Sequence, residues 1–153
     1  MPRHHVERVL PYAPGQLFDL VGAVERYPEF VPWITSMRAE PPREVAPGVD
    51  ERVAEAGVGF AFLTERFTTS VRRDRPACLI EVGLVRGPFR RLSNRWRFVA
   101  DGQGTRVVFD IDFTFRTRLL DALLVANFDR AVGRLIACFE ARAAVLYGAP
   151  APR

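Results

Sequence analysis

The chain has 153 residues, a usual length for one domain and enough to enclose a sizeable core. Hydrophobic residues make up 48% of it, and 22 basic residues, every one an arginine, exceed 18 acidic residues to give a net charge of +4. The lack of any run of about 18 apolar residues excludes a spanning helix, and without a secretion-signal core we expect a cytoplasmic protein. The basic excess suits an anionic membrane surface or RNA.

The first predicted elements are a short strand and an amphipathic helix. Residues 3–10 are predicted to form the strand, which the prolines at 11 and 14 interrupt. Pro14 suits the first turn of a helix. The helix should end before residue 27, where a tyrosine precedes a proline. Its apolar residues recur at helical spacing: Leu17, Leu20, Val21 and Val24.

Residues 27–33, with the sequence YPEFVPW, hold three aromatic rings and two prolines. Each proline fixes its own φ and lacks a backbone N–H, and it pushes the preceding residue toward extended geometry. The segment, called the corner below, is therefore predicted to be a stiff, irregular turn that carries large apolar side chains. Such a turn can cap a core, or it can form the lip of an apolar pocket.

The middle of the chain alternates apolar and polar residues, which is the period of half-buried strands. Residues 35–45 form the first such segment, and Pro41 and Pro42 mark it as an edge strand. Turn signals separate the segments that follow. Further strands are predicted within residues 51–62, 67–71, 79–85, 92–98 and 107–115.

The longest helical pattern covers residues 117–147 and ends at Gly148 and Pro150, which together are a sound stop signal. The order is strand, helix, a run of strands joined by short turns, and one long helix. That order predicts an α+β protein with its helices gathered on one face of an antiparallel sheet. The apolar stripe of the long helix consists of Leu120, Leu124, Phe128, Val132, Leu135 and Phe139.

Three motifs occur in sequence order along nearly the whole chain. The first is the corner, and the second is residues 87–92, GPFRRL, followed by Trp96 and Phe98. The third is the alternation of phenylalanines in residues 109–115, which leads into a helix bearing Phe128, Phe139, Arg142 and Tyr147. Together they resemble the coenzyme Q-binding proteins of the START-like superfamily, which is related to polyketide cyclases and includes bacterial ribosome-association toxin-like members.

The resemblance implies one START-like lipid-binding domain over residues 1–153 with a helix-grip fold. In that fold, a curved antiparallel sheet of about six or seven strands wraps around the long C-terminal helix and leaves an apolar cavity. The resemblance also implies that the protein binds ubiquinone without catalysis, as a carrier or chaperone supporting respiration, with no separate cofactor. Two alternatives remain open: a toxin-like protein that binds the large ribosomal subunit and blocks subunit association, and a polyketide cyclase- or aromatase-like enzyme.

Inward aromatic side chains are the candidates for lining such a cavity, because pockets are lined by large apolar groups. Ordinary core packing is the alternative for each of them. The predicted ligand-binding residues come from the corner, the strands and the last helix: Phe30, Trp33, Phe60, Phe62, Phe67, Asn94, Trp96, Phe109, Phe113, Leu124, Phe128 and Val132.

Three features bear on ligand exchange and on partners. Asn94 lies on an inward face, so its amide must either bond to nearby backbone or meet a quinone-like carbonyl. Leu119 and Leu123 lie off the main stripe of the last helix, and either pack against the corner or form an apolar mouth for a bilayer. The arginines at 72–75 and 86–97 either form a solvated face or contact anionic lipid or ribosomal RNA.

The sequence lacks catalytic and metal-binding patterns. Asp110 and Asp112 share a strand face that is predicted to point outward, where carboxylates are surface charges rather than an acid and a base. His4 and His5 have no cysteine or carboxylate at ligand spacing, so no metal site is expected. The expected partners are ubiquinone or a similar isoprenoid lipid, a peripherally contacted inner membrane, or the large ribosomal subunit, and not DNA.

Overall fold

The computed structural model describes residues 3–60 and 63–148 and, within them, every side chain except those at 60, 63, 120 and 123–128. The order of its elements confirms the predicted α+β class, with a long helix at the end. In chain order they are β1 (Arg3–Leu10), α1 (Pro14–Gly22), the 3-10 helix η1 (Val24–Glu29), β2 (Ile34–Ala39), β3 (Arg43–Ala46), β4 (Val49–Phe60), β5 (Leu63–Asp74), β6 (Leu79–Arg86), β7 (Phe89–Asp101), β8 (Gly104–Phe115) and α2 (Arg118–Tyr147).

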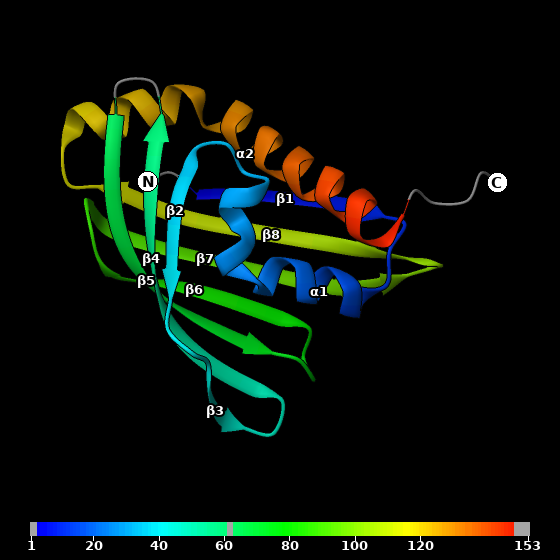
Figure 1. Ribbon diagram of the computed structural model, residues 1–153. Helices are drawn as coiled ribbons and strands as arrows, with labels where there is room; N and C mark the ends of the chain where they lie inside the picture. The colour runs from blue at the N-terminus through cyan, green and yellow to red at the C-terminus, as the bar shows by residue number, and fades with distance from the viewer. Residues whose placement is uncertain (1–2, 61–62, 149–153) are drawn as a thin grey trace.

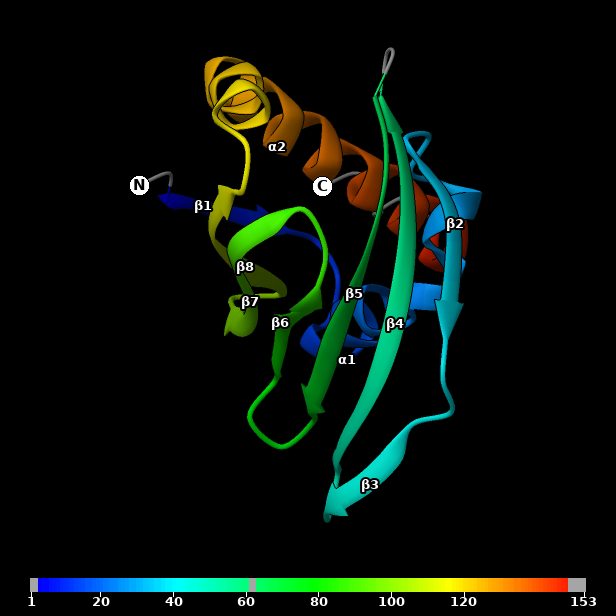
Figure 2. The ribbon, with the colours of Figure 1, turned by 90° about the vertical axis from the view of Figure 1, so that its left-hand side faces the viewer.

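The strands of the described residues form one antiparallel sheet in the order β1-β8-β7-β6-β5-β4-β2, and β3 pairs with β4 as well. Figure 1 shows α2 crossing the sheet above β1 and β8, with α1 below it on the same side. Figure 2 shows β4 and β5 bending up past the helices, so that the sheet curves around them. This arrangement is the helix-grip fold that the sequence motifs implied.

The edge strand predicted over residues 35–45 is divided in two. Both β2 and β3 pair with β4, and Pro41 and Pro42 lie between them, where no ladder hydrogen bond is required of their nitrogens. The edge position is confirmed. The division brings the strands of the described chain to eight, against the six or seven that the resemblance implied.

The first helix is shorter than its apolar spacing indicates. α1 ends at Gly22, whose carbonyl accepts hydrogen bonds from the Arg52 and Arg73 guanidinium groups at 2.9 and 3.4 Å. Val24 is buried as predicted, but it belongs to the 3-10 helix η1, which also contains Pro28. The α-helix therefore ends before residue 27, as the proline pattern required.

Strands β7 and β8 form the floor beneath the helices. Trp96 and Phe98 are buried while Arg95 and Arg97 are exposed, so one face of β7 packs inward along the strand. Trp96 lies directly across from Phe109 of β8. The alternation predicted from the sequence is confirmed, and it directs the aromatic rings of both strands toward α1 and α2.

Candidate ligand-binding interior

The second half of α2 closes over a tightly packed aromatic group. The ring of Phe139 lies 5.1–5.3 Å from the rings of Trp96, Tyr27 and Phe30, in edge-to-face geometry, and Trp96 lies 4.6 Å from Phe109. Such contacts stabilise a core beyond the area that they bury. We call this the first aromatic cluster, and it ties the sheet, the corner and α2 into one packed unit.

The corner contacts α2 through an ion pair and cation–π contacts as well as through packed aromatic rings. The Arg142 guanidinium donates to Glu29 at 2.7 Å and lies 5.3 Å from the centre of the Phe30 ring. Arg134 lies over Trp33 at 5.9 Å, a separation at which a cation is attracted to the face of an aromatic ring. The Tyr27 hydroxyl donates to the carbonyl of Val21, and burial raises the pKa of this phenol.

The contact between Arg142 and Glu29 should make stability depend on pH. Hydrogen bonds from Arg26 and then from Arg142 hold the pKa of Glu29 below its ordinary 4.5. A carboxyl with a lowered folded-state pKa stabilises the protein above its unfolded-state pKa, and this contribution is lost as pH falls through the folded value. Glu29→Gln should therefore lower the melting temperature at neutral pH, and the difference from wild type should vanish in acid.

Thermal unfolding at neutral pH and well below pH 4.5 measures this difference. Glu40→Gln is the matched control, because Glu40 is exposed and forms no ion pair with any described residue. Its melting temperature should follow wild type at both pH values. A Glu29→Gln deficit that persists unchanged in acid would show that the carboxylate charge is not its cause.

The packed end of the interior leaves almost no free volume. A partly open cavity of about 20 Å³ lies among β1, α1, β7, β8 and α2, which is room for about one water molecule. A lipid therefore does not fit at this end. The cavity is lined by Arg8, Leu10, Leu17, Leu20, Val21, Trp96, Phe98, Val107, Ile136 and Phe139.

A second aromatic cluster lies where β7 begins and β8 ends, next to the start of α2. Its buried members are Phe89, Phe113 and Phe115, and Phe89 stacks on Phe115 at 4.5 Å. Phe67 of β5 meets Phe89 edge-on at 5.3 Å. The partly buried Ile111 packs against both clusters and so marks the boundary between them.

The Gly-Pro-Phe motif has a structural reason at this cluster. Gly87 has a φ of +153°, and a Cβ placed on it would lie 2.5 Å from the Cβ of Phe67. Only glycine tolerates that conformation and that close approach. The turn thereby brings Phe89 of β7 against Phe67 of β5.

Asn94 faces the interior at this boundary, across from Ile111 in the neighbouring strand. Its amide nitrogen donates to the carbonyl of Asp110 at 3.0 Å, and its oxygen accepts from the Trp96 indole at 2.9 Å. Of the two alternatives for this residue, the bond to nearby backbone is therefore present. An amide carries two hydrogens, so one hydrogen remains beyond the bond to Asp110.

The predicted ligand-binding residues are divided among three places. Trp96 and Phe109 belong to the first aromatic cluster, and Val132 is buried in the core around it. Phe113 belongs to the second cluster, against which the partly buried Phe67 packs. The corner contributes two residues to the predicted set, Phe30 and Trp33, and both contact α2. The side chains of Phe60, Leu124 and Phe128, and all of Phe62, lie outside the described residues.

Four aromatic residues of these clusters were missing from the predicted set. They are Tyr27, Phe89, Phe115 and Phe139, which all pack inward and all occur in the motifs that carry the family resemblance. The motif positions themselves were the signal that could have found Tyr27 and Phe89. Phe115 continues the alternation of β8 and could have been found by its period.

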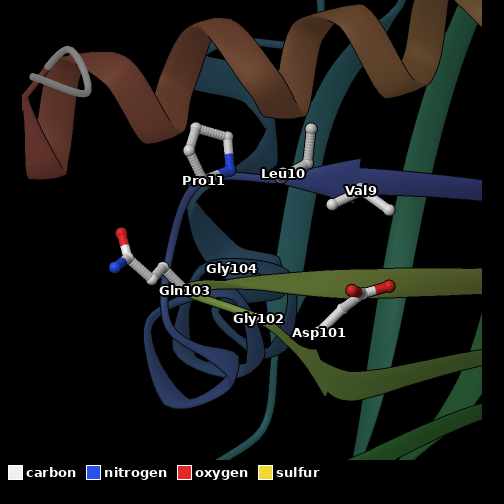
Figure 3. A pocket seen from close by; sticks show the side chains of 7 residues that line it. All are labelled: Val9, Leu10, Pro11, Asp101, Gly102, Gln103 and Gly104. Atoms are coloured by element: carbon white, nitrogen blue, oxygen red, sulfur yellow. The ribbon is translucent and has the colours of Figure 1, made fainter. Parts of the chain in front are cut away.

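A second hollow lies at the end of the molecule that holds the β7–β8 turn, outside the space between sheet and α2. It is an open surface groove beside the β7–β8 turn, and Figure 3 shows its side chains spread apart around the end of β1. Its polar side chains, Asp101 and Gln103, are on the turn itself. It is lined by Val9, Leu10, Pro11, Asp101, Gly102, Gln103 and Gly104.

Within the described part of the chain, no helix is long and apolar enough to cross a membrane. Nor does any group of three histidine, cysteine or acidic side chains gather there in a way that could hold a metal ion.

Asp110 points outward, as predicted, and pairs with His5, which also contacts Glu7. These bonds, first to Glu7 and then to Asp110, raise the pKa of His5.

The curved sheet, the long closing helix and the aromatic interior define a START-like protein. The chain belongs to the polyketide cyclase/dehydrase and lipid transport family, whose model matches residues 10–140. This confirms the resemblance that the three sequence motifs indicated.

Relatives within this family are similar over nearly the whole chain. The ribosome association toxin RatA of Pseudomonas aeruginosa is 35% identical over 147 residues, covering 94% of this chain and 98% of that protein. RatA of Rickettsia prowazekii is 32% identical, covering 89% and 92%. The mitochondrial coenzyme Q-binding protein COQ10 homolog B of Xenopus laevis is 28% identical, covering 92% of this chain but 57% of that protein.

Solved structures agree with the fold. An 18 kDa protein of Caulobacter crescentus, determined in solution, is 58% identical, with a TM-score of 0.82 and coverage of 97% of this chain and 100% of that one. A Streptomyces aromatase/cyclase is 20% identical, with a TM-score of 0.72 and coverage of 94% and 96%. At that identity the likeness to the cyclase shows a shared fold alone.

Proposed function

We propose that the protein binds a ubiquinone-like isoprenoid quinone between the sheet and the first half of α2, and carries or presents it without catalysing a reaction. The observation that carries the proposal is the boundary at Ile111 and Asn94, where apolar side chains of two clusters meet beside one amide. Membership of the polyketide cyclase/dehydrase and lipid transport family and similarity to a protein named for coenzyme Q binding support it.

The position follows from the packing. The first aromatic cluster fills the end beneath the second half of α2, where the cavity of about 20 Å³ is far too small for a quinone. The second cluster offers phenylalanine and aliphatic side chains from β5, β6, β7 and β8. An isoprenoid tail needs only apolar surface, because each CH₂ that leaves water contributes about 0.8 kcal/mol.

The head group would lie at the boundary, beside Asn94. A quinone ring carries two carbonyl acceptors, and the remaining amide hydrogen of Asn94 suits one of them. The indole of Trp96 holds the amide in place through its bond to the Asn94 oxygen. A single polar contact that fixes orientation in an otherwise apolar site is the usual pattern for small-molecule pockets.

The polar content of the interior favours binding over catalysis. Among the described residues, the buried polar side chains besides those of the tyrosines and Arg52 are Thr68, Thr69 and Thr105, which do not titrate in the physiological range. Burial raises the pKa of the Tyr27 phenol further above that range. The Thr69 and Thr105 hydroxyls donate to the carbonyls of Ala54 and Tyr12. A cyclase would need a titratable group within reach of its substrate.

Lipid extraction and mass spectrometry of protein purified from its native host test the proposal directly. We expect an isoprenoid quinone to co-purify in an amount comparable to that of the protein. A matched extraction from an unrelated soluble protein of the same host measures carry-over. Quinone at only the carry-over level, together with no uptake of added quinone by the delipidated protein, would reject the proposal.

A second candidate function is association with the ribosome. The observation that favours it is the identity of 32–35% to two proteins named ribosome association toxins, over nearly the whole chain. Sedimentation through a sucrose gradient with purified large ribosomal subunits at low salt tests it. Failure to comigrate under those conditions would remove this candidate and leave the quinone proposal standing.

A further inference from the structure

The arginines of the described chain fall into two groups. Along the outer face of the sheet most are paired with carboxylates, including Arg72 with Glu51 at 2.7 Å and Arg95 with Glu81 at 3.0 Å. A second group is exposed and forms no ion pair with any described residue. At one end of the molecule this group consists of Arg66, Arg86, Arg90, Arg116 and Arg118.

These five arginines, called the basic end below, come from three segments that the fold brings together. Residue 86 of β6 lies opposite Thr68 of β5, close to Arg66. The backbone N–H of Arg116 donates to the carbonyl of Pro88 at 2.8 Å, which joins the β8–α2 link to the β6–β7 turn. Figures 1 and 2 both place this turn and the start of α2 on the same side of the molecule.

Few carboxylates offset the charge of the basic end. Within residues 63–68, 84–91 and 115–121 the acidic side chains are those of Glu65 and Asp121. Asp121 already accepts a hydrogen bond from the backbone N–H of Phe115 at 3.3 Å. The basic end therefore presents a net positive surface to solvent.

Large apolar side chains stand among these arginines. Leu119, in the first turn of α2, is 72% exposed and adjoins Arg118. Val85, directly before Arg86, is 52% exposed. Exposed apolar side chains within a basic surface are the combination that binds an anionic lipid interface. The apolar side chains enter the headgroup region, and the arginines neutralise the negative charge of the headgroups.

We propose that the basic end docks on a bilayer surface rich in anionic phospholipid. The charge of the surface fits anionic headgroups, and the exposed Leu119 favours a bilayer over RNA, whose phosphates would leave that side chain in water. This docking is separate from the proposed interior site, because it concerns the outer surface and does not depend on which ligand the interior binds. It places the second aromatic cluster next to the membrane, where an apolar ligand could be exchanged.

Vesicle flotation with the full-length protein tests the docking. The vesicles are of phosphatidylcholine alone or of phosphatidylcholine mixed with phosphatidylglycerol. We expect flotation with the mixed vesicles only, and loss of flotation as salt is raised. Arg86→Gln combined with Arg90→Gln should weaken partition about 25-fold, at roughly fivefold for each arginine near the surface.

Arg38→Gln combined with Arg43→Gln is the matched control, because it removes the same charge from exposed, unpaired positions on β2 and β3. It should float almost as wild type does, and circular dichroism should show both double variants folded. Equal losses in the two double variants would overturn the inference, since net charge alone would explain them.

Two other results would also overturn it. One is the absence of flotation with anionic vesicles. The other is binding of purified ribosomal RNA through Arg86 and Arg90, with no binding to vesicles, which would make the basic end an RNA surface. Leu119→Ser also distinguishes vesicle binding from RNA binding, because it should weaken vesicle partition while leaving RNA binding unchanged. Quinone extraction from the same variants shows independently whether the interior site is intact.

Discussion

Replacing Phe139 with alanine is expected to lower the free energy of unfolding by about 3–5 kcal/mol. The side chain is 4% exposed and contacts the rings of Tyr27, Phe30 and Trp96 at 5.1–5.3 Å. Its removal would leave a cavity at the one place where the sheet, the corner and α2 meet, and the surrounding rings can collapse into it only in part. Urea unfolding followed by circular dichroism measures the loss.

Val145→Ala on the same helix is the control, because that side chain is 75% exposed. Its effect should stay within about 0.5 kcal/mol, as for most surface substitutions. If Phe139→Ala cost no more than this control, the first aromatic cluster would not be the packed anchor that the ring distances indicate. The corner would then need another source of rigidity.

Replacing Ile111 with tryptophan is expected to abolish quinone uptake while the protein stays folded. Ile111 packs against both aromatic clusters, so an indole there would occupy the boundary that we assign to the quinone head group. Overpacking at a partly buried position costs about 1–3 kcal/mol, which a domain of ordinary stability survives. Quinone content after extraction gives the binding result, and urea unfolding reports the stability.

Val99→Trp provides the matched control for size and chemistry. Val99 lies on the outward face of β7 and is 47% exposed, so its indole would extend into solvent. This variant should retain quinone at the wild-type level. A folded Ile111→Trp protein that also retained it would show that the ligand lies elsewhere, and the boundary between the clusters would no longer be the proposed site.

The strands could be predicted well because each has one buried face. In β7 the alternation of Arg95, Trp96, Arg97 and Phe98 is a local signal, and the structure buries the aromatic pair and exposes the arginines. The long helix likewise carries its own stop signal, and its described end at Tyr147 matches the predicted one. The alternation of apolar residues along the strand and the stop residues after the helix were therefore enough to predict these elements.

The contacts between distant segments could not be predicted in the same way. The Arg142–Glu29 pair joins residues 113 positions apart, and nothing in either neighbourhood indicates the other. The division of the interior into two aromatic clusters depends on where α2 crosses the sheet. The spacing of apolar residues along a strand or helix does not contain that information. The choice between packing and ligand contact for Trp96 or Phe113 therefore could not be made from the sequence.

The chain has two tryptophans, and the fold places them in contrasting surroundings. Trp96 is 4% exposed within the packed cluster, whereas Trp33 is half-buried in the corner beneath Arg134. Their fluorescence emission should consequently differ in wavelength, with the sheltered indole emitting further to the blue. Because quinones quench nearby indoles, the protein carries two native optical probes on different sides of its interior, and no dye is needed to follow loading.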